Sequence, residues 1–424
     1  MANTFNIAFM ADTHLDYSAY EHTDGQGINL RAKDGEKALH EIVNQIINSD
    51  VKIDAVVHGG DIFHRSHPSI RAIKLFQYYT RQLASRGIPF YGLAGNHDAS
   101  DNRAIMPSVA AVDDPDKNIH ALWTPYQKYQ IADGIALHSV GHHGLSAEDA
   151  PQITPDADMI NIFTTHGAAL DPKNSTLMQC QDSPREQIIP PEMIVDDNFA
   201  MRLLGHYHSR YPVGGQLLNT WYAGSTVRRG FSDDAGDRGW LLIKVHPDGK
   251  TEVEFRNISQ RPQYDLHIID AEGKNAAEVQ ELIEMNLLGT GVDLNSEAFD
   301  EANAPIVRQR VINAPRSLRA GLDKKRIAAM TRNFLHWDLK YPVSEVKKVT
   351  KLNDEGQLVE VAEDATGQES SNTLKSAASV NPVEYFDNWA GNSKTLTNLS
   401  GATRQKVVDT ARRHLESVQS KNEN

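Results

Sequence analysis

Short, almost continuous apolar runs recur along the first 250 residues of the chain. They span 5–10, 53–57, 90–93, 135–140, 159–164, 201–204 and 240–245. Such runs are typical of strands that are buried on both faces of a sheet. Between them, two stretches carry apolar residues with helical spacing: Leu39, Ile42, Val43, Ile46 and Ile47, and then Ile73, Phe76, Tyr79 and Leu83. Strands that alternate with amphipathic helices predict an α/β domain.

A change of pattern near Arg261 and Pro262 marks a second, smaller region. Strand-like segments at 264–269 and 306–312 alternate with helical stretches at 276–287 and 324–335, which predicts a small α+β domain. Residues 351–379 are rich in Glu, Asp, Ser, Thr and Gly, as linkers are, although 357–361 also fits a strand. We therefore expect a main domain over 1–258, a capping domain over 259–348, an acidic linker over 349–380 and a helical tail over 381–424.

The tail has features of a segment that binds a partner. It carries an aromatic cluster, Tyr385, Phe386 and Trp389. One narrow apolar stripe follows at helical spacing: Val407, Ala411, Leu415 and Val418. A narrow stripe is suited to packing on another helix, either of a partner or of this chain's own capping domain.

Composition limits the class of protein. Of the 424 residues, 40% are hydrophobic and 23% are charged, which is enough to bury a core. No run of about 18 apolar residues occurs, so no transmembrane helix is expected, and residues 1–10 lack the basic start of a signal peptide. A single cysteine, Cys180, excludes an intrachain disulfide and a cysteine-based zinc site. We expect a cytoplasmic protein.

Charge is distributed unevenly along the chain. The net charge of −13 argues against a protein that simply coats nucleic acid. Residues 305–342, however, hold nine Lys or Arg against two Asp, whereas 352–373 hold six acidic residues and no basic one. Both segments fit solvated surface, and the basic one also fits contact with phosphates.

Polar side chains of one chemical kind follow five of the apolar runs. They lie in the segments Asp12-Thr13-His14, Gly60-Asp61, Gly95-Asn96-His97-Asp98, His166-Gly167 and Gly205-His206-Tyr207-His208. Each segment alone is an ordinary turn. Five in succession are not, because the carboxyl ends of the strands of an open α/β sheet form the edge where ligands bind.

These side chains share the chemistry of metal ligands. Carboxylate oxygen, imidazole nitrogen and amide oxygen without thiolate suit Mn²⁺, Fe or Zn²⁺. Seven candidate ligands are too many for one ion. Two ions that share a carboxylate account for them, and ions about 3.5–4 Å apart are typical of phosphoesterases and nucleases.

The order of these motifs resembles that of the calcineurin-like metallophosphoesterases. Within them it is most similar to the SbcD nuclease family, the bacterial and phage relatives of the meiotic recombination nuclease. Three further features carry this resemblance: Leu15 after His14, the block Asp61-Ile62-Phe63-His64, and Tyr222-Ala223-Gly224-Ser225 followed by Arg229 and Arg238. The motifs cover about residues 5–245, and beyond them only the domain order is similar.

The resemblance implies a fold and a set of roles. The fold is a β-sandwich flanked by helices, followed by a small α+β capping domain. One metal would be held by Asp12, His14, Asp61 and His208, and the second by Asp61, Asn96, His166 and His206, with Asp61 as the bridge. His97 would protonate the leaving oxygen, Asp98 would orient His97, and His64 would be a second catalytic histidine that helps to hold the phosphate or His97.

The resemblance also implies a function: a Mn-dependent DNA exonuclease or endonuclease in recombination, repair or replication, with Mg, Fe or Zn as other possible metals. Relatives form dimers and work with an SbcC-type ABC ATPase, which the helical tail would grip. Arg316, Arg319, Lys324 and Lys325 are the expected DNA contacts. Two other readings are a phosphodiesterase or phosphatase acting on nucleotides or other phosphoesters, and a non-catalytic scaffold, although the complete ligand set argues against the scaffold.

Overall fold

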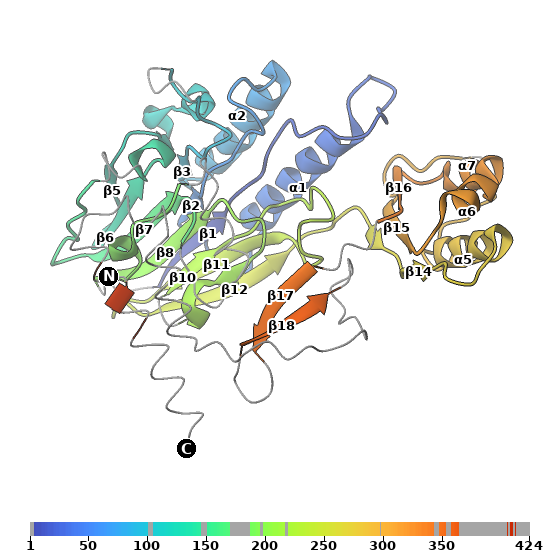
Figure 1. Ribbon diagram of the computed structural model, residues 1–424. Coiled ribbons are helices and arrows are strands. Elements are labelled where there is room, and N and C mark those ends of the chain that lie inside the picture. The colour runs from blue at the N-terminus through green and yellow to red at the C-terminus, as the bar shows by residue number, and fades with distance from the viewer. Residues whose placement is uncertain are drawn as a thin grey trace. The chain divides into compact units, whose positions relative to one another are not determined.

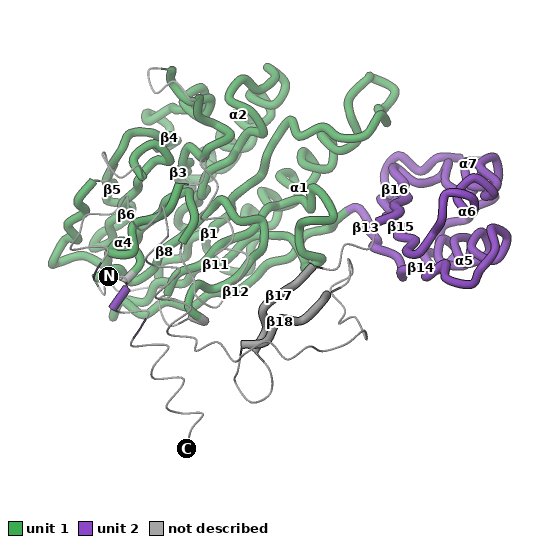
Figure 2. Tube along the Cα trace, in the orientation of Figure 1, with its two compact units in different colours: residues 1–260 green, residues 261–424 purple. Residues whose placement is uncertain are grey.

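The chain folds into two compact units, residues 1–260 and residues 261–424 (Figures 1 and 2). The computed structural model describes residues 4–100, 105–145, 151–169, 187–195, 198–216, 219–296, 298–342, 347–352 and 358–363, together with 405, 408, 409 and 412. The first unit contains every strand that precedes the five polar motifs.

A mixed six-stranded sheet forms one layer of the first unit. Its strands are β1 (Phe5–Met10), β2 (Ala55–His58), β3 (Phe90–Leu93), β4 (Ile119–Leu122), β11 (Gly239–Val245) and β12 (Thr251–Asn257). Their order is β12-β11-β1-β2-β3-β4. Strands β1 to β4 run parallel, and β11 and β12 complete the sheet in antiparallel fashion. The parallel strands therefore end at one common edge.

A second six-stranded sheet forms the facing layer. Its strands are β5 (Gln127–Ala132), β6 (Ile135–Val140), β7 (Ile160–His166), β8 (Phe199–Gly205), β9 (Tyr211–Pro212) and β10 (Thr220–Tyr222). Their order is β5-β6-β7-β8-β10-β9, with β6, β7, β8 and β10 parallel. Both layers are visible in Figure 1.

The two sheets pack face to face around one apolar core. Phe5, Ile7 and Phe9 of β1 belong to the cluster that β6, β7 and β8 share, whereas Ala8 and Met10 belong to the cluster on the opposite face. There α1 (Leu30–Ile47) and α2 (Ile70–Ala84) cover the first sheet with the apolar stripes that their sequences predict. Because β1 is buried on both faces, its sequence is a continuous apolar run.

The second sheet is covered on its outer face by shorter elements. They are the 3-10 helix η3 (His142–Leu145) and α4 (Pro191–Val195), whose apolar side chains join a separate cluster with Phe163 and Leu204. Three further 3-10 helices lie in the connections: η1 (Ser108–Val112), η2 (Pro115–Lys117) and η4 (Val213–Gln216). The expectation of a β-sandwich flanked by helices is confirmed.

The strands that the apolar pattern did not predict are short or lie at sheet edges. They are β4, β5, β9, β10 and β12. In β5, for example, exposed and half-buried positions alternate until Ile131, so it lacks a continuous apolar run. Such strands are recognised only through the neighbour with which they pair.

The second unit is built around one central strand. β15 (Ile306–Ile312) pairs in parallel with β13 (Gln263–Asp265), β14 (Ile269–Asp270) and β16 (His336–Lys340). Against this sheet pack α5 (Ala276–Leu288), α6 (Arg316–Gly321) and α7 (Lys324–Thr331), with Val279, Ile283 and Val311 fully buried. The predicted strand over 264–269 is in fact divided into β13 and β14. The helix predicted over 324–335 ends at Thr331, because β16 begins five residues later.

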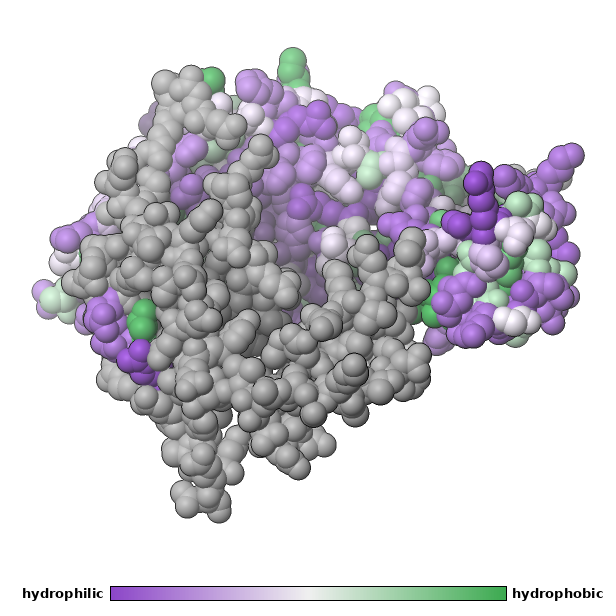
Figure 3. Space-filling model, in the orientation of Figure 1, coloured by the Kyte–Doolittle hydropathy of each residue, from purple (hydrophilic) through white to green (hydrophobic). Residues whose placement is uncertain are grey.

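Two strands fall largely within the segment expected to be an acidic linker, and the first of them begins two residues before it. β17 (Lys347–Leu352) and β18 (Leu358–Glu363) pair antiparallel, and β18 overlaps the strand alternative at 357–361. The aromatic cluster and the apolar stripe of the tail lie outside the described residues. In the part of the chain that is described, no helix has the length and apolar character needed to cross a membrane, and the described surface seen in Figure 3 is mostly hydrophilic.

Candidate metal centre

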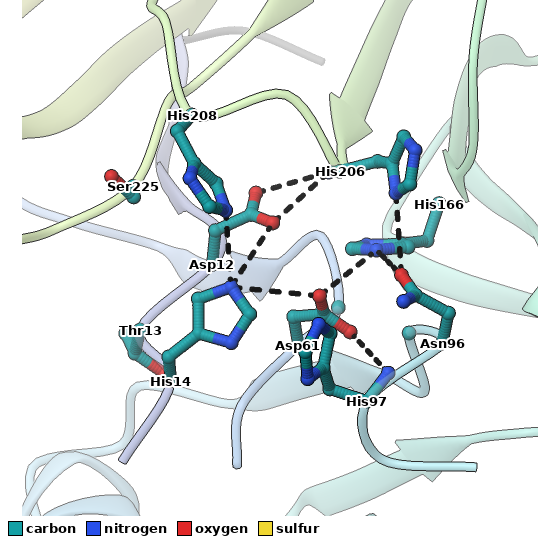
Figure 4. Close-up of polar contacts among 12 residues, drawn as sticks. Asp12, Thr13, His14, Asp61, Asn96, His97, His166, His206, His208 and Ser225 are labelled. Carbon is teal, nitrogen blue, oxygen red and sulfur yellow. Dashed lines mark hydrogen bonds and ion pairs between the residues drawn. The ribbon is translucent and has the colours of Figure 1, made fainter. Parts of the chain in front are cut away.

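The loops that follow five parallel strands meet at one edge of the sandwich. Asp12 and His14 follow β1, Asp61 follows β2, Asn96 follows β3, His166 ends β7, and His206 and His208 follow β8. We call these seven residues the ligand cluster (Figure 4). Both sheets contribute, so the cluster exists only when the sandwich has formed.

The backbone at this edge adopts conformations that are uncommon for residues with a side chain. φ is +53° at Asp12, +42° at His14, +54° at Asp61 and +109° at His206. Positive φ costs free energy outside glycine and persists only where the surrounding structure enforces it. Here the enforcement is visible, since Asp12 donates its N–H to the carbonyl of Gly60 at 3.0 Å and His14 donates to that of Asp61 at 3.0 Å.

Glycines allow the loops to approach one another this closely. A Cβ atom at Gly95 would lie 2.1 Å from Oδ1 of Asp61, and one at Gly205 would lie 2.1 Å from the carbonyl oxygen of Gly59. Any larger residue at either position would therefore push Asp61 or the β2 loop out of place.

Four side chains of the cluster form a first group around His14. Its Nε2 lies 3.2 Å from Nε2 of His208 and 3.6 Å from Oδ2 of Asp61. Oδ1 of Asp12 lies 3.9 Å from the same nitrogen. Apart from half-buried His208, these side chains are almost fully buried.

The second group forms around His166 and shares Asp61 with the first. Nε2 of His166 lies 3.4 Å from Oδ2 of Asp61 and 3.0 Å from Oδ1 of Asn96. The same amide oxygen lies 3.2 Å from Nδ1 of His206. One oxygen, Oδ2 of Asp61, thus faces both groups.

The donor set fits divalent cations. Two carboxylates, four imidazoles and one amide oxygen converge. In two sets of three residues the ligand atoms all lie within 4.8 Å of one another: the first set is Asp12, His14 and His208, and the second is Asp12, Asp61 and His166. Buried carboxylates need compensating charge, and hard or borderline cations prefer these donors. The cluster is therefore suited to divalent cations.

Burial and neighbouring charges set the ionisation of the cluster. Burial raises the pKa of Asp12. Burial acts the same way on Asp61, but the charges of His166 and His14 outweigh it and lower the pKa of Asp61 well below its usual range. Burial alone would lower the pKa of His166, but Asp61 and Asp12 raise it to about 9. A cation at His166 must therefore replace a proton.

For two of the cluster histidines, His166 and His208, the ring nitrogen that faces away from the cluster has its own partner, whereas Nδ1 of His14 is buried without one among the described residues. Nδ1 of His166 donates to the carbonyl oxygen of Gly59 at 2.8 Å. Nδ1 of His208 lies 3.2 Å from Oδ1 of Asp233, and this contact, together with Arg229, overcomes burial and lowers the pKa of Asp233 to about 2. Such partners orient metal-binding histidines. Sequence reasoning missed Asp233, which belongs to no motif and is brought to His208 by the chain reversal before β11.

The two proposed catalytic histidines lie together beside the first group. The backbone N–H of His97 donates to Oδ1 of Asp61 at 2.8 Å, and its ring Nδ1 donates to the carbonyl oxygen of His64 at 2.7 Å. The rings of His64 and His97 stack with centroids 5.1 Å apart, and the His97 and His14 rings meet edge to face at 4.8 Å. Burial lowers the pKa of His64 to about 4, so this ring is neutral.

The predicted contact between Asp98 and His97 is corrected by the structure. The fully buried carboxylate of Asp98 accepts backbone N–H groups from Ile62 at 3.0 Å, Phe63 at 2.8 Å and Gly95 at 3.0 Å. It therefore ties the β2 loop to the β3 loop, and the carbonyl of His64 holds the ring of His97 instead. Burial and the charge of Asp61 raise the pKa of Asp98 to about 7.

Another buried histidine, His58, is not a member of the cluster but holds together the two loops that carry Asp12, His14 and Asp61. His58 donates through Nε2 to the hydroxyl of Thr13 at 3.1 Å, since that hydroxyl itself donates to the carbonyl of Ile62 at 2.9 Å. Its Nδ1 accepts the N–H of Gly60 at 3.3 Å. Burial lowers the pKa of His58 to about 3, so it is a neutral brace between the β1 and β2 loops.

The four basic residues expected to contact DNA belong to the second unit. Arg316 and Arg319 lie on α6, and Lys324 and Lys325 begin α7. All four are exposed. We call them the basic face.

Comparison with known sequences identifies the first unit. The family model of the calcineurin-like phosphoesterases matches residues 5–238, more than half of the chain. A protein from Haloferax volcanii named DNA double-strand break repair protein Mre11 is 27% identical over 261 residues, which cover 60% of this chain and 53% of that protein. A protein of the same name from Methanosarcina acetivorans is 32% identical over 265 residues, 62% of this chain and 40% of its own.

The chain thus spans about half the length of these curated relatives, or less. Among solved structures, a dimetal phosphatase from Danio rerio matches 60% of this chain and 97% of its own, with a TM-score of 0.37 and 11% sequence identity. The match to the family model, which includes all seven residues of the ligand cluster, carries the assignment.

Proposed function

This chain belongs to the calcineurin-like phosphoesterase family, and from that premise we propose that it is a metal-dependent nuclease that hydrolyses phosphodiester bonds of DNA in repair, recombination or replication. One observation carries the proposal. Oδ2 of Asp61 lies 3.6 Å from Nε2 of His14 and 3.4 Å from Nε2 of His166, so one carboxylate oxygen faces both ligand groups. A two-metal phosphoesterase needs such a shared ligand. The relatives named for DNA break repair support DNA as the substrate.

Two divalent ions, when bound, neutralise phosphate charge and activate the attacking water. In this proposal they are held by Asp12, His14, Asp61 and His208, and by Asp61, Asn96, His166 and His206. Imidazole and oxygen donors without thiolate suit Mn²⁺, which we propose as the working metal, and Mg²⁺, Fe²⁺ and Zn²⁺ are its competitors.

His97 is the proposed proton donor to the leaving oxygen. Its Nδ1 is engaged by the carbonyl of His64 at 2.7 Å, and its Nε2 has no hydrogen-bond partner among the described residues. Its backbone N–H holds Oδ1 of Asp61, which fixes the residue beside the shared carboxylate. The stacked His64 ring restricts rotation of His97. A positioned histidine of this kind contributes about 10²–10⁴-fold to rate.

The decisive experiment measures cleavage by the full chain. Labelled single-stranded and duplex oligonucleotides, a chromogenic phosphodiester and a chromogenic phosphomonoester are each incubated with Mn²⁺ and with EDTA. We expect oligonucleotide cleavage that requires Mn²⁺ and stops with EDTA. Hydrolysis of the small diester or monoester without oligonucleotide cleavage would overturn the proposal in favour of a phosphodiesterase or a phosphatase. Bound metal without any hydrolysis would indicate a scaffold.

The basic face is the proposed DNA contact of the second unit. Arg316, Lys324 and Lys325 form no ion pair with a carboxylate in the described part of the chain, and Arg319 lies over the ring of Tyr341 at 5.3 Å. Exposed cations without internal partners are available to phosphates, whose neutralisation supplies much of the affinity for DNA.

A homodimer is proposed through α2 and the segment that precedes η1. Four of the most exposed large apolar side chains of the first unit lie there: Ile70, Tyr78, Ile105 and Met106. Exposed apolar residues that form one contiguous patch mark association surfaces, and we propose that these four take part in such a patch. Light scattering on the wild-type protein and on the variant Tyr78→Glu tests this, with a dimer and a monomer as the expected results; a monomeric wild-type protein would contradict it.

We also propose an SbcC-type ATPase as partner, bound through residues 381–424. The support is the sequence of that segment, whose aromatic cluster and narrow apolar stripe suit docking on a helix. Removal of the segment should abolish co-purification with such an ATPase. A DNA-processing role also fits the cytoplasmic location that the cysteine content suggests.

A further inference from the structure

The loop between β10 and β11 brings an arginine to the ligand cluster. Nη2 of Arg229 lies 2.7 Å from Nε2 of His208 and 3.2 Å from Nδ1 of the same ring. The Arg229 side chain is half buried. A permanently charged group therefore lies next to the first ligand group, in contact with the ring of His208.

The backbone of this loop is fixed by two almost fully buried arginines. Arg238 donates to the carbonyl oxygens of His208 and of Asp234, the latter at 2.7 Å. Arg31, which pairs with Asp34 at 2.6 Å, donates to the carbonyl oxygen of Arg228. Both side chains are only 2% exposed. Buried cations are costly unless several partners satisfy them, so the loop is a built element of the site.

The backbone of Arg229 is held at both its carbonyl oxygen and its N–H. Its carbonyl oxygen accepts the hydroxyl of Tyr17 at 3.0 Å, and its N–H donates to Oδ2 of Asp233 at 2.8 Å. The same carboxylate uses its other oxygen to hold Nδ1 of His208. The position of His208 is thus maintained by Asp233, and the guanidinium of Arg229 is not needed for that task.

The guanidinium has no carboxylate partner among the described residues. Its contacts are the His208 ring and the face of the Tyr17 ring, 5.9 Å from the centroid. Arg71 and Arg308, by contrast, each form a two-point pair with an acid, Glu36 and Asp265 respectively. Once Nε2 of His208 serves a cation, it no longer accepts from Arg229. The charge of Arg229 also acts on Asp233, whose pKa it helps to lower, but the oxygens of that carboxylate already hold Nδ1 of His208 and the backbone N–H of Arg229, so the guanidinium can take a further anion.

We propose that Arg229 binds a non-bridging oxygen of the substrate phosphodiester next to the ligand cluster. The inference rests on the proposed function and adds to it a residue that belongs to none of the metal-binding motifs. A planar guanidinium presents paired N–H donors that match two phosphate oxygens, which a lysine does not reproduce. In this proposal Arg229 holds the DNA strand through a phosphate, and the ligand cluster lies beside the bond that is cleaved.

The test measures DNA binding without cleavage. Full-length protein carrying His97→Ala is compared with the same protein carrying Arg229→Gln or Arg229→Lys as well, using fluorescence anisotropy of a labelled single-stranded oligonucleotide in Mn²⁺. We expect Arg229→Gln to raise Kd about 10-fold to 100-fold, as for the loss of a hydrogen bond to a charged group, and to reduce the salt slope by about 0.7. Arg229→Lys should restore part of the affinity. Mn²⁺ content should stay at the parent value.

The matched control is Arg256→Gln on β12, where an arginine pairs with Asp50 and Glu254 on the surface. Its Kd should equal that of the parent protein. An unchanged Kd for Arg229→Gln, or a loss of Mn²⁺ in that variant, would overturn the inference, since the second result would make Arg229 a support of His208. Failure of the parent protein to bind DNA and of the wild-type protein to cleave it would instead refute the proposed function.

Discussion

The ligand cluster of the first unit and the basic face of the second hold their charged groups in opposite ways. Asp12, His14, Asp61 and His166 are at most 2% exposed, and each contacts several other members of the cluster. The side chains of the basic face are exposed, and they sit on two short helices. Contacts within the cluster fix the positions of its charged atoms, whereas the basic face exposes its charges to solvent.

The difference shows what each region is able to recognise. Buried charges repay their desolvation only when an opposite charge sits at a defined distance, so the cluster selects an ion by geometry. Exposed lysines and arginines keep their hydration and respond to any nearby phosphate, with an affinity that salt screens. Chemistry is therefore expected from the first region, and affinity without base recognition from the second.

The largest effect is expected where both ligand groups meet. Asp61→Asn removes the shared negative charge, so both ions should bind far more weakly and DNA cleavage should fall below detection. Metal analysis and oligonucleotide cleavage on the purified variant measure this. Control variants at Asp248, a surface acid that pairs with Lys250, should keep both properties. If this variant still bound two ions at wild-type affinity, the proposal that both ions share the Asp61 carboxylate would be wrong.

Next in size is the loss of the proposed proton donor. His97→Ala should retain metal and DNA binding and lose cleavage by about 10²–10⁴-fold, because the residue touches the cluster only through its backbone N–H and the edge of its ring. Cleavage rate, Mn²⁺ content and Kd are measured together. Loss of metal in this variant would assign His97 to the ligands instead. His67→Ala, at an exposed position on the β2 loop, serves as its control.

Charge reversal tests the second region. Changing all four residues of the basic face to Glu should weaken DNA binding on the order of 10²-fold at low salt and reduce the salt slope by about one per lost contact. Hydrolysis of a small phosphodiester should persist. The control reverses four exposed lysines of the first unit, Lys37, Lys52, Lys117 and Lys250. Equal loss of affinity in both variants would show that net charge alone matters.

The smallest expected effect concerns the buried brace beneath the cluster. The pKa of His58 in the folded protein, about 3, lies below its unfolded value of about 6.5. As pH falls below about 6.5, His58 of the unfolded chain gains a proton that the folded protein does not bind. The contribution of His58 to the free energy of unfolding is therefore fully present above this pH and is lost progressively below it. Between pH 7 and pH 5 the loss amounts to about 2 kcal/mol.

Urea unfolding in EDTA at both pH values checks this prediction. His58→Asn should lower stability at pH 7 and should show a pH dependence smaller by that amount, whereas the exposed His67→Asn should retain the wild-type dependence. If the free energy of unfolding of both variants depended on pH to the same extent, the low pKa assigned to buried His58 would be wrong.

Local sequence decided the layers of the molecule. All seven apolar runs of the first 250 residues form strands, and the apolar stripes of α1 and α2 face the first sheet. Both features can be predicted because a strand buried on both faces needs consecutive apolar residues, and a helix on a sheet needs apolar residues at helical spacing. Residue types alone also marked the five loops that carry acid, amide and imidazole groups. Edge strands such as β5 and β9 have no such pattern, because pairing with a neighbouring strand stabilises them.

Tertiary structure decided which atoms meet. The resemblance implied Asp61 as the shared ligand, but only the structure shows that a single oxygen, Oδ2, faces both groups. It also shows that Asp98 ties two loops together instead of orienting His97. The sequence left Asp233 outside every motif and gave Arg229 no role beyond its place after the Tyr222–Ser225 segment, although both residues contact His208 from the β10–β11 loop. The physical reason is range: apolar patterning acts between neighbours in the chain, whereas hydrogen bonds and charge pairs join residues about 20 to 200 positions apart, which only the closed sandwich brings within 4 Å.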